Sequence, residues 1–179
     1  MKARARGFTL LEVLVVMLIL AIVMGIALPR FQAFLGSRVK SDMRALIGTV
    51  ELAYFLAASQ KKPVRINFDI SSGRFWLSML EITDPVQNIG EFKDLNTQRT
   101  QLSSGVRFTD IFVAHSGKVD KGEVFAMCMP QGYCEPTVIH LRDDYGHEYT
   151  LRIKPLTGEV TVYQGYRDFV TMWPNQSPW

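Results

Sequence analysis

One acidic side chain, Glu12, lies within an otherwise uncharged apolar run from Phe8 to Leu28. A carboxylate is costly to keep ionised near a bilayer, so it is by default a functional residue that needs a cationic partner. No cationic side chain follows Phe8 before Arg30, but cleavage after Gly7 would create an α-ammonium on Phe8. We expect Glu12 to pair with that ammonium, in its own chain or in a neighbouring copy, where the pairing would set the register of an assembly. The alternative is a carboxylate solvated among lipid headgroups.

Two cysteines, Cys128 and Cys134, enclose a turn-forming stretch between two expected strands. A tight turn would bring the thiols within bridging distance, and a disulfide of this size stabilises by roughly 2 kcal/mol in the chain-entropy account. We expect a disulfide in an oxidising compartment, with two reduced structural cysteines as the alternative. A metal pair is disfavoured because the histidines show no ligand spacing with the cysteines.

Catalytic motifs are missing: the sequence has no Gly-x-Ser-x-Gly, no Gly-rich phosphate loop and no His-Glu-x-x-His. His140 alternates with the apolar Ile139 and Leu141, so we expect its ring to face solvent or a polar contact. The carboxylates that could bind a divalent cation match no calcium-loop pattern; they are Asp84, Glu91 and Asp94. We predict no enzyme activity, no cofactor and no metal site.

The charge balance does not indicate a basic nucleic-acid binder. The chain has 20 Lys and Arg against 17 Asp and Glu, and three of the basic residues lie within residues 1–7. Without that segment the opposite charges balance, whereas nucleic-acid binding needs clustered Lys and Arg on an exposed face. A patch of Arg38, Lys40 and Arg44 is the best candidate, but we expect this helix to pack inward and therefore expect no nucleic-acid partner.

A long helix must position Glu12. Residues 8–28 span roughly 30 Å as a helix, which matches a hydrocarbon core, and the run is too long for a cleaved secretory signal. We therefore expect a membrane-spanning helix over 8–29 and a bend at Pro29, which lacks an N–H group. An amphipathic continuation over 30–60 is indicated by apolar residues spaced by three or four, namely Phe31, Leu35, Val39, Met43, Leu46, Val50, Ala53 and Ala57.

A β-rich domain is expected over 61–172, followed by a tail over 173–179. Alternating apolar residues and turn signals predict about seven strands after the helix, at Val64 to Ile70, Arg74 to Ile82, Val106 to Val113, Glu123 to Cys128, Thr137 to Arg142, His147 to Lys154 and Glu159 to Tyr163. Residues 83–105 read as a long loop that contacts a partner or simply extends over the surface, with room for a short helix or strand inside it. The fold class is α+β, with an antiparallel sheet packed on one long helix.

The N-terminus resembles that of the type IV pilin-like prepilins, which include type IV pilins and type II secretion pseudopilins. The resemblance covers residues 1 to about 35 and rests on a short basic leader, Gly7 before Phe8, Glu12 as the fifth residue after the glycine, and Pro29 as the twenty-second. It implies removal of leader 1–7 by a prepilin peptidase that cuts between Gly7 and Phe8, N-methylation of Phe8, a role for Glu12 in assembly and a helix bend at Pro29.

Within this superfamily the stretches Gly146 to Leu151 and Thr157 to Val162 are most similar to the H-type minor pseudopilin of type II secretion. That resemblance implies a subunit near the pseudopilus tip that helps initiate the filament driving folded exoproteins through the outer-membrane secretin. The implied partners are other pseudopilins (the major subunit and the tip minor subunits), the prepilin peptidase, the inner-membrane assembly platform and the lipid bilayer. The implied topology is single-pass in the bacterial inner membrane, with a cytoplasmic N-terminus and a periplasmic globular domain.

Two alternatives remain open. The first is a minor type IV pilin that acts in adhesion, motility or DNA uptake. The second is a single-span membrane binding protein that does not assemble, for which Glu12 would be dispensable.

Overall fold

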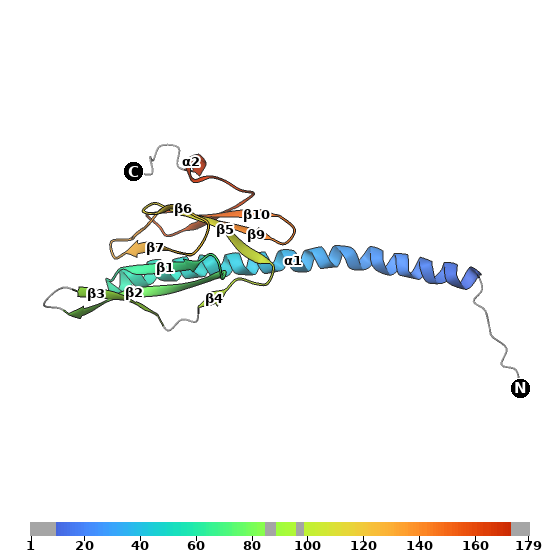
Figure 1. Cartoon of the computed structure of the whole chain (residues 1–179), viewed down its shortest axis with the longest axis horizontal. Coiled ribbons are helices and arrows are strands. Elements are labelled where there is room, and N and C mark those ends of the chain that lie inside the picture. Colours follow the sequence, from blue (N-terminus) through green and yellow to red (C-terminus); the bar gives the residue numbers. More distant parts are fainter. Residues whose placement is uncertain (1–9, 85–88, 96–98, 173–179) are drawn as a thin grey trace, which may run out of the picture. The chain divides into compact units, whose positions relative to one another are not determined.

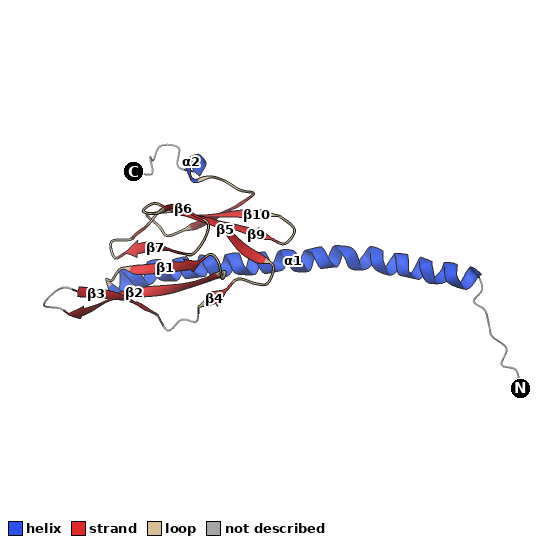
Figure 2. Cartoon of the chain, viewed as in Figure 1, coloured by secondary structure: helices blue, strands red, loops and turns tan. Residues whose placement is uncertain are grey.

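The computed structural model describes the backbone of residues 10–84, 89–95 and 99–172, and their side chains apart from those of 25–37, 83, 84 and 89. The chain divides into two compact units, Met1–Arg38 and Val39–Trp179, which are described separately. Figure 1 labels the elements along the chain, and Figure 2 colours them by secondary structure. Helix α1 (Leu10–Gln60) belongs to both units.

In the first unit, α1 consists of strongly apolar residues. All side chains from Leu10 to Met24 are exposed, and Glu12 is the acidic residue of the first turn. An acidic side chain at this end of a helix interacts favourably with the helix dipole. In the part of the chain that the structure describes, no helix is both long and apolar enough to cross a membrane.

In the second unit, the amphipathic stripe of α1 faces the core as predicted. Its described members are buried: Val39, Met43, Leu46, Val50, Ala53 and Ala57. The helix ends at Gln60, Lys61 adopts a left-handed conformation with φ of 53°, and Pro63 follows. A left-handed residue after the last turn and a nearby proline are common ways to end a helix.

The first sheet contains six strands in the order β3-β2-β1-β7-β8, with β4 paired to β2. Its strands are β1 (Val64–Asp69), β2 (Arg74–Asp84), β3 (Ile89–Asp94), β4 (Thr100–Gln101), β7 (Glu123–Met129) and β8 (Tyr133–Cys134). The predicted β1–β2 hairpin is present, with Val64 opposite Met79 and Asp69 opposite Arg74. Its turn places Gly73 at φ of 68°, a conformation that glycine adopts without steric cost.

The second sheet contains five antiparallel strands in the order β11-β10-β9-β5-β6. Its strands are β5 (Val106–Val113), β6 (Gly117–Val119), β9 (Thr137–Asp143), β10 (Glu148–Ile153) and β11 (Val160–Gln164). After β11, the chain forms the short helix α2 (Phe169–Met172). Strand β9 lies between β10 and β5, and all but one of its residues are buried.

One core joins the second half of α1 to the inner faces of both sheets. Figure 1 shows β1 and β2 alongside this part of the helix, and the core cluster includes the fully buried side chains of Phe68, Ile111 and Leu151. Burial of each such side chain stabilises the fold by about 1.5–3 kcal/mol. The α+β fold class predicted from the sequence is confirmed.

The strand count differs from the expected seven: the described residues form eleven strands in two sheets. The segment expected to be a long loop, 83–105, contains the end of β2 together with β3 and β4. Strand β3 lies at a sheet edge and exposes most of its described side chains, so its sequence lacks the alternation of a half-buried strand. Strands β6 and β8 were missed because they have three and two residues.

Candidate functional site

The N-terminal candidate site lies mostly outside the described residues. Gly7 and Phe8 are among those not described, so cleavage, methylation and pairing of the Phe8 amine with Glu12 stay predictions. Glu12 lies in the first turn of α1 with an exposed side chain. Pro29 has helical backbone on both sides, but its side chain is not described, and the predicted bend stays a prediction.

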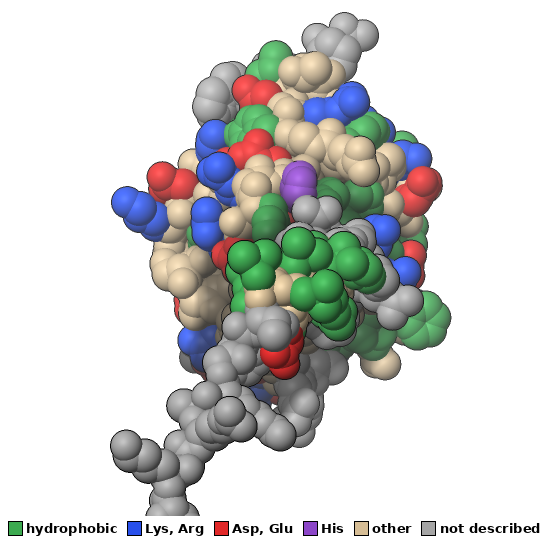
Figure 3. Space-filling model, turned by 90° about the vertical axis from the view of Figure 1, so that its right-hand side faces the viewer, with side chains coloured by type: hydrophobic (Ala, Val, Ile, Leu, Met, Phe, Trp, Pro, Cys, Tyr) green, Lys and Arg blue, Asp and Glu red, His purple; other side chains and the backbone are tan. Residues whose placement is uncertain are grey.

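The described part of the first unit presents a continuous apolar surface. Figure 3 shows hydrophobic side chains gathered over the N-terminal part of α1, and exposed fractions range from 43% for Val15 to 85% for Leu10. Soluble monomers rarely expose apolar patches of this extent, and such patches mark contact with lipid or with another protein. The candidate site of this unit is therefore a contact surface that includes Glu12 at its N-terminal end, rather than a pocket.

The two cysteines form a disulfide, as predicted for an oxidising environment. Cys128 in β7 lies opposite Cys134 in β8, with a Cα–Cα distance of 4.0 Å. Within the second unit the turn of this hairpin contacts α1 through the hydroxyl of Tyr54, whose proton is shared between the carbonyl of Gly132 at 3.5 Å and that of Leu156, in the β10–β11 connection, at 3.3 Å. The bridge therefore fixes a hairpin whose turn also contacts the helix.

His140 is buried rather than solvent-facing. Its ring is 2% exposed, with Nδ1 2.7 Å from Asp110 Oδ1 and Nε2 3.0 Å from the carbonyl of Arg167. Tyr166 stacks on the ring with a centroid distance of 3.9 Å. Both ring nitrogens therefore lie within hydrogen-bond distance of oxygen atoms. The expected polar contact is confirmed, and the expected solvent exposure is wrong.

His140 is buried because another segment of the chain covers the outer face of the second sheet. Residues 165–172, here called the C-terminal cover, pack on this face. The Phe169 ring stacks on that of Phe112 with a centroid distance of 3.9 Å, and the hydroxyl of Thr150 on β10 donates a hydrogen bond to the carbonyl of Gly165 at 2.7 Å. Alternation along a strand shows which side chains share a face, but it does not reveal what covers that face. No local pattern in the sequence indicates this cover.

The other two histidines also pair with carboxylates. His115 Nδ1 lies 2.7 Å from Glu135 Oε1, and His147 Nδ1 lies 2.9 Å from Asp143 Oδ2. Burial raises the pKa of Asp143, but hydrogen bonds from His147 outweigh this effect and leave that pKa below its ordinary value. In the described residues no serine, threonine or cysteine is hydrogen bonded to a histidine ring, so no nucleophile is paired with a base there.

The carboxylates considered for cation binding are dispersed or already bonded. Asp94 accepts hydrogen bonds from Trp76 Nε1 and from Arg99 Nη2, each at 2.9 Å, and Glu91 is exposed on β3. The side chain of Asp84 lies outside the described residues. Across the described ranges, no group of three or more His, Cys, Asp or Glu side chains is arranged to hold a metal ion.

The N-terminal segment matches a known family. Residues 2–28 match the family model described as the prokaryotic N-terminal methylation motif. Over 61 residues, the chain is 36% identical to the type IV narrow pilus major component PilA5 of Thermus thermophilus, a match that covers 34% of this chain and 53% of that protein. The chain thus matches only about half the length of this curated relative.

A solved structure supports the fold. The minor pseudopilin EpsH of the Vibrio cholerae type II secretion system superposes with a TM-score of 0.54 at 12% identity, covering 74% of this chain and 98% of EpsH. A second EpsH structure gives a TM-score of 0.48 at 12% identity, over 72% and 96% of the two chains.

The N-terminal segment carries the methylation motif, and the long helix with its antiparallel sheets gives the chain a type IV pilin-like fold, similar to that of the pseudopilin EpsH. Over one third of its length the sequence is also similar to the pilin PilA5.

Proposed function

We propose that the chain is a minor pseudopilin of a type II secretion pseudopilus. In this role a prepilin peptidase removes residues 1–7 and Phe8 is methylated. Residues 8–29 then hold the subunit in the inner membrane, with the second unit in the periplasm, until it joins the filament near its tip. The observation that carries the proposal is the combination of a methylation motif at residues 2–28 with a fold similar to that of EpsH along most of both chains.

Two features of the described structure support an assembling subunit. The exposed apolar surface of residues 10–24 suits burial in lipid before assembly and among other helices afterwards. The Cys128–Cys134 disulfide suits an oxidising compartment such as the periplasm. The proposed partners are the major and tip pseudopilins and the assembly platform, and the proposed role is structural rather than enzymatic.

A minor type IV pilin is the second candidate, favoured by the 36% identity with PilA5 over 61 residues. Deleting the gene in the native host separates the two functions. Loss of exoenzyme secretion with normal pili supports the pseudopilin, whereas loss of pili, motility or transformation with normal secretion supports the pilin.

Processing is tested by the intact mass of the protein extracted from native membranes, compared with a strain lacking the prepilin peptidase. We expect loss of residues 1–7 and a gain of one methyl group in the first strain and the full-length chain in the second. A chain that begins at Met1 in both strains would refute the proposed processing.

Glu12 gives the sharpest residue-level test. We expect Glu12→Ala to leave insertion and cleavage intact but to abolish incorporation into the filament, because the carboxylate no longer pairs with the Phe8 ammonium. Glu12→Gln keeps a hydrogen-bonding group without the charge and separates the two contributions. Normal incorporation of Glu12→Ala, measured by cross-linking to the major subunit, would refute the pairing.

A further inference from the structure

A groove runs over the outer face of the first sheet, beside the disulfide hairpin. It has a volume of about 350 Å³ and is lined mainly by Phe125, Met127, Met129, Tyr133 and the His115–Glu135 pair. Phe125, Met127 and Met129 alternate along β7, each half-buried, while the residues between them face the core. Methionine side chains adapt to different apolar partners, so this lining suits a binding surface.

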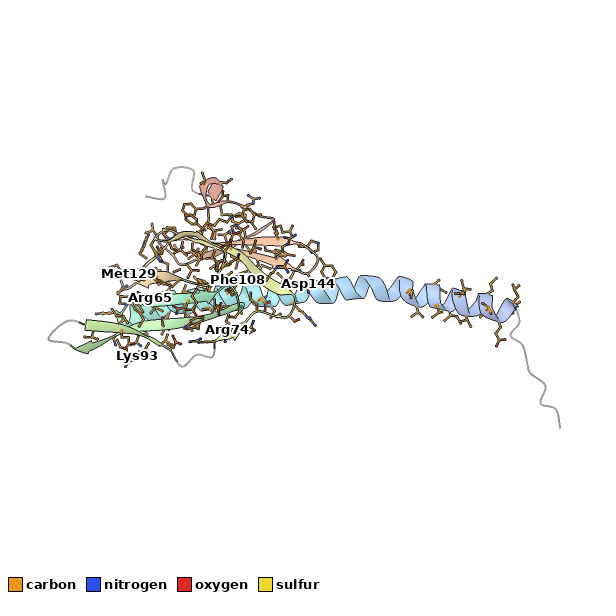
Figure 4. The ribbon with its side chains drawn as sticks, in the orientation of Figure 1. Arg65, Arg74, Lys93, Phe108, Met129 and Asp144 are labelled. Atoms are coloured by element: carbon orange, nitrogen blue, oxygen red, sulfur yellow. A yellow bond between two sulfur atoms is a disulfide. The ribbon has the colours of Figure 1, made fainter. Side chains whose placement is uncertain are left out.

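Arg65 lies next to this groove on the neighbouring strand. In the β1–β7 ladder Arg65 is directly opposite Met127, so both side chains lie on the same outer face. Its guanidinium carbon is 3.5 Å from the centroid of the Phe92 ring and 4.1 Å from that of Phe125, which also lines the groove. Figure 4 labels Arg65 on β1 and Met129 on β7.

The charge of Arg65 is not compensated by an acidic side chain among the described residues. Its Nε is buried without a hydrogen-bond partner there, and burial lowers the pKa of the guanidinium. The two rings stabilise the cation through their faces, but they do not replace the strong hydrogen bonds of a carboxylate. An anion should therefore bind Arg65 more tightly than it would bind a fully solvated arginine.

Two carboxylates near this surface are already bonded to other groups. Asp94, on the same sheet, accepts from Trp76 and Arg99. Glu135, in the groove wall, accepts from the backbone amide of His115 at 2.8 Å and contacts its ring. The surface thus combines an apolar groove with a cationic side chain, Arg65, next to Phe125. No carboxylate of the described residues neutralises this cation.

We propose that Arg65 and the groove of Phe125, Met127 and Met129 form a docking site for a polypeptide segment of another protein. The segment carries apolar side chains, which enter the groove, and an adjacent carboxylate, which binds Arg65. This complementarity of charge and apolar surface is present whether or not the chain enters a filament.

The test uses the full-length chain in an uncharged detergent, labelled with ¹³C at the methionine methyl groups. Two probe peptides differ only in charge: acetyl-Leu-Phe-Glu-amide and acetyl-Leu-Phe-Gln-amide. We expect both to shift the methyl signals of Met127 and Met129, with the acidic peptide binding about tenfold more tightly, the factor for one charge-assisted hydrogen bond. Arg65→Gln should remove this preference.

Arg99→Gln is the matched control, because Arg99 also lies over an aromatic ring, 4.3 Å from Trp76, but already pairs with Asp94 at 2.9 Å. It should leave the preference unchanged. Equal affinity of the two peptides for the wild-type chain, or equal loss in both variants, would overturn the proposal. So would methyl shifts at Met127 that depend on protein concentration without peptide, since a second copy would then fill the groove. The wild-type comparison stands even if Arg65→Gln does not fold.

Discussion

Replacing His140 with leucine should destabilise the second unit by about 5 kcal/mol. The substitution leaves the Asp110 carboxylate, 4% exposed, without its main partner, and breaking a buried pair in this way costs about 3–5 kcal/mol. It also removes a hydrogen bond to Arg167, about 1 kcal/mol, and a ring stack on Tyr166, about 0.5–1.5 kcal/mol. Lys118 Nζ, 3.5 Å from Asp110, keeps the loss from being larger.

The assay is urea unfolding of the full-length chain in detergent, followed by near-UV circular dichroism, with the free energy of unfolding compared at constant slope. His147→Leu is the matched control. It removes a histidine that also pairs with a carboxylate, but its side chain is 67% exposed, so the loss should stay below about 1 kcal/mol.

A double variant tests the coupling. Combining His140→Leu with Asp110→Leu removes both buried polar groups, so it should recover at least half of the loss. A loss below about 1 kcal/mol for His140→Leu, or a double variant equal to the sum of the single ones, would refute the buried-pair argument.

Three further substitutions test the turns. Hydrogen bonds from the hydroxyl and amide of Ser72 hold the pKa of Asp69 below its ordinary value. The ionised Asp69 side chain therefore stabilises the fold at pH values above its unfolded-state pKa. This stabilisation is lost as the pH falls through the lower, folded-state pKa. Asp69→Asn should abolish this acid-side loss in thermal melts, and an unchanged acid dependence would contradict it. Gly158→Ala should cost about 3 kcal/mol, because its φ is 65° and the new Cβ would lie 2.8 Å from the Tyr54 ring. Gly117→Ala, with φ of 73° and open space, should cost only about 1 kcal/mol, and equal losses would exclude the steric contribution.

Much of the fold could be predicted because its signals are local. The spacing of Val39, Met43 and Leu46 reflects one buried helix face, and the alternation from Val64 onward reflects a strand with one face in the core. The disulfide was predictable for the same reason, since Cys128 and Cys134 flank a short turn.

Features set by distant segments could not be predicted. The burial of His140 depends on Tyr166 and Arg167, which follow it by more than twenty residues. Only the fold brings Arg65 over the rings of Phe92 and Phe125, which are 27 and 60 residues further along the chain. The edge strand β3 was missed because a strand exposed on both faces has no period to detect.

The position of the C-terminal cover has a consequence for how the chain folds as it is made. Residues 165–172 leave the ribosome after every strand that they pack on, so the outer face of the second sheet stays hydrated until this segment has been made. Until then Phe112 and His140 lack the partners that bury them. A chain that stops before Tyr166 would keep the strands of both sheets but leave Phe112 and His140 without the side chains that bury them.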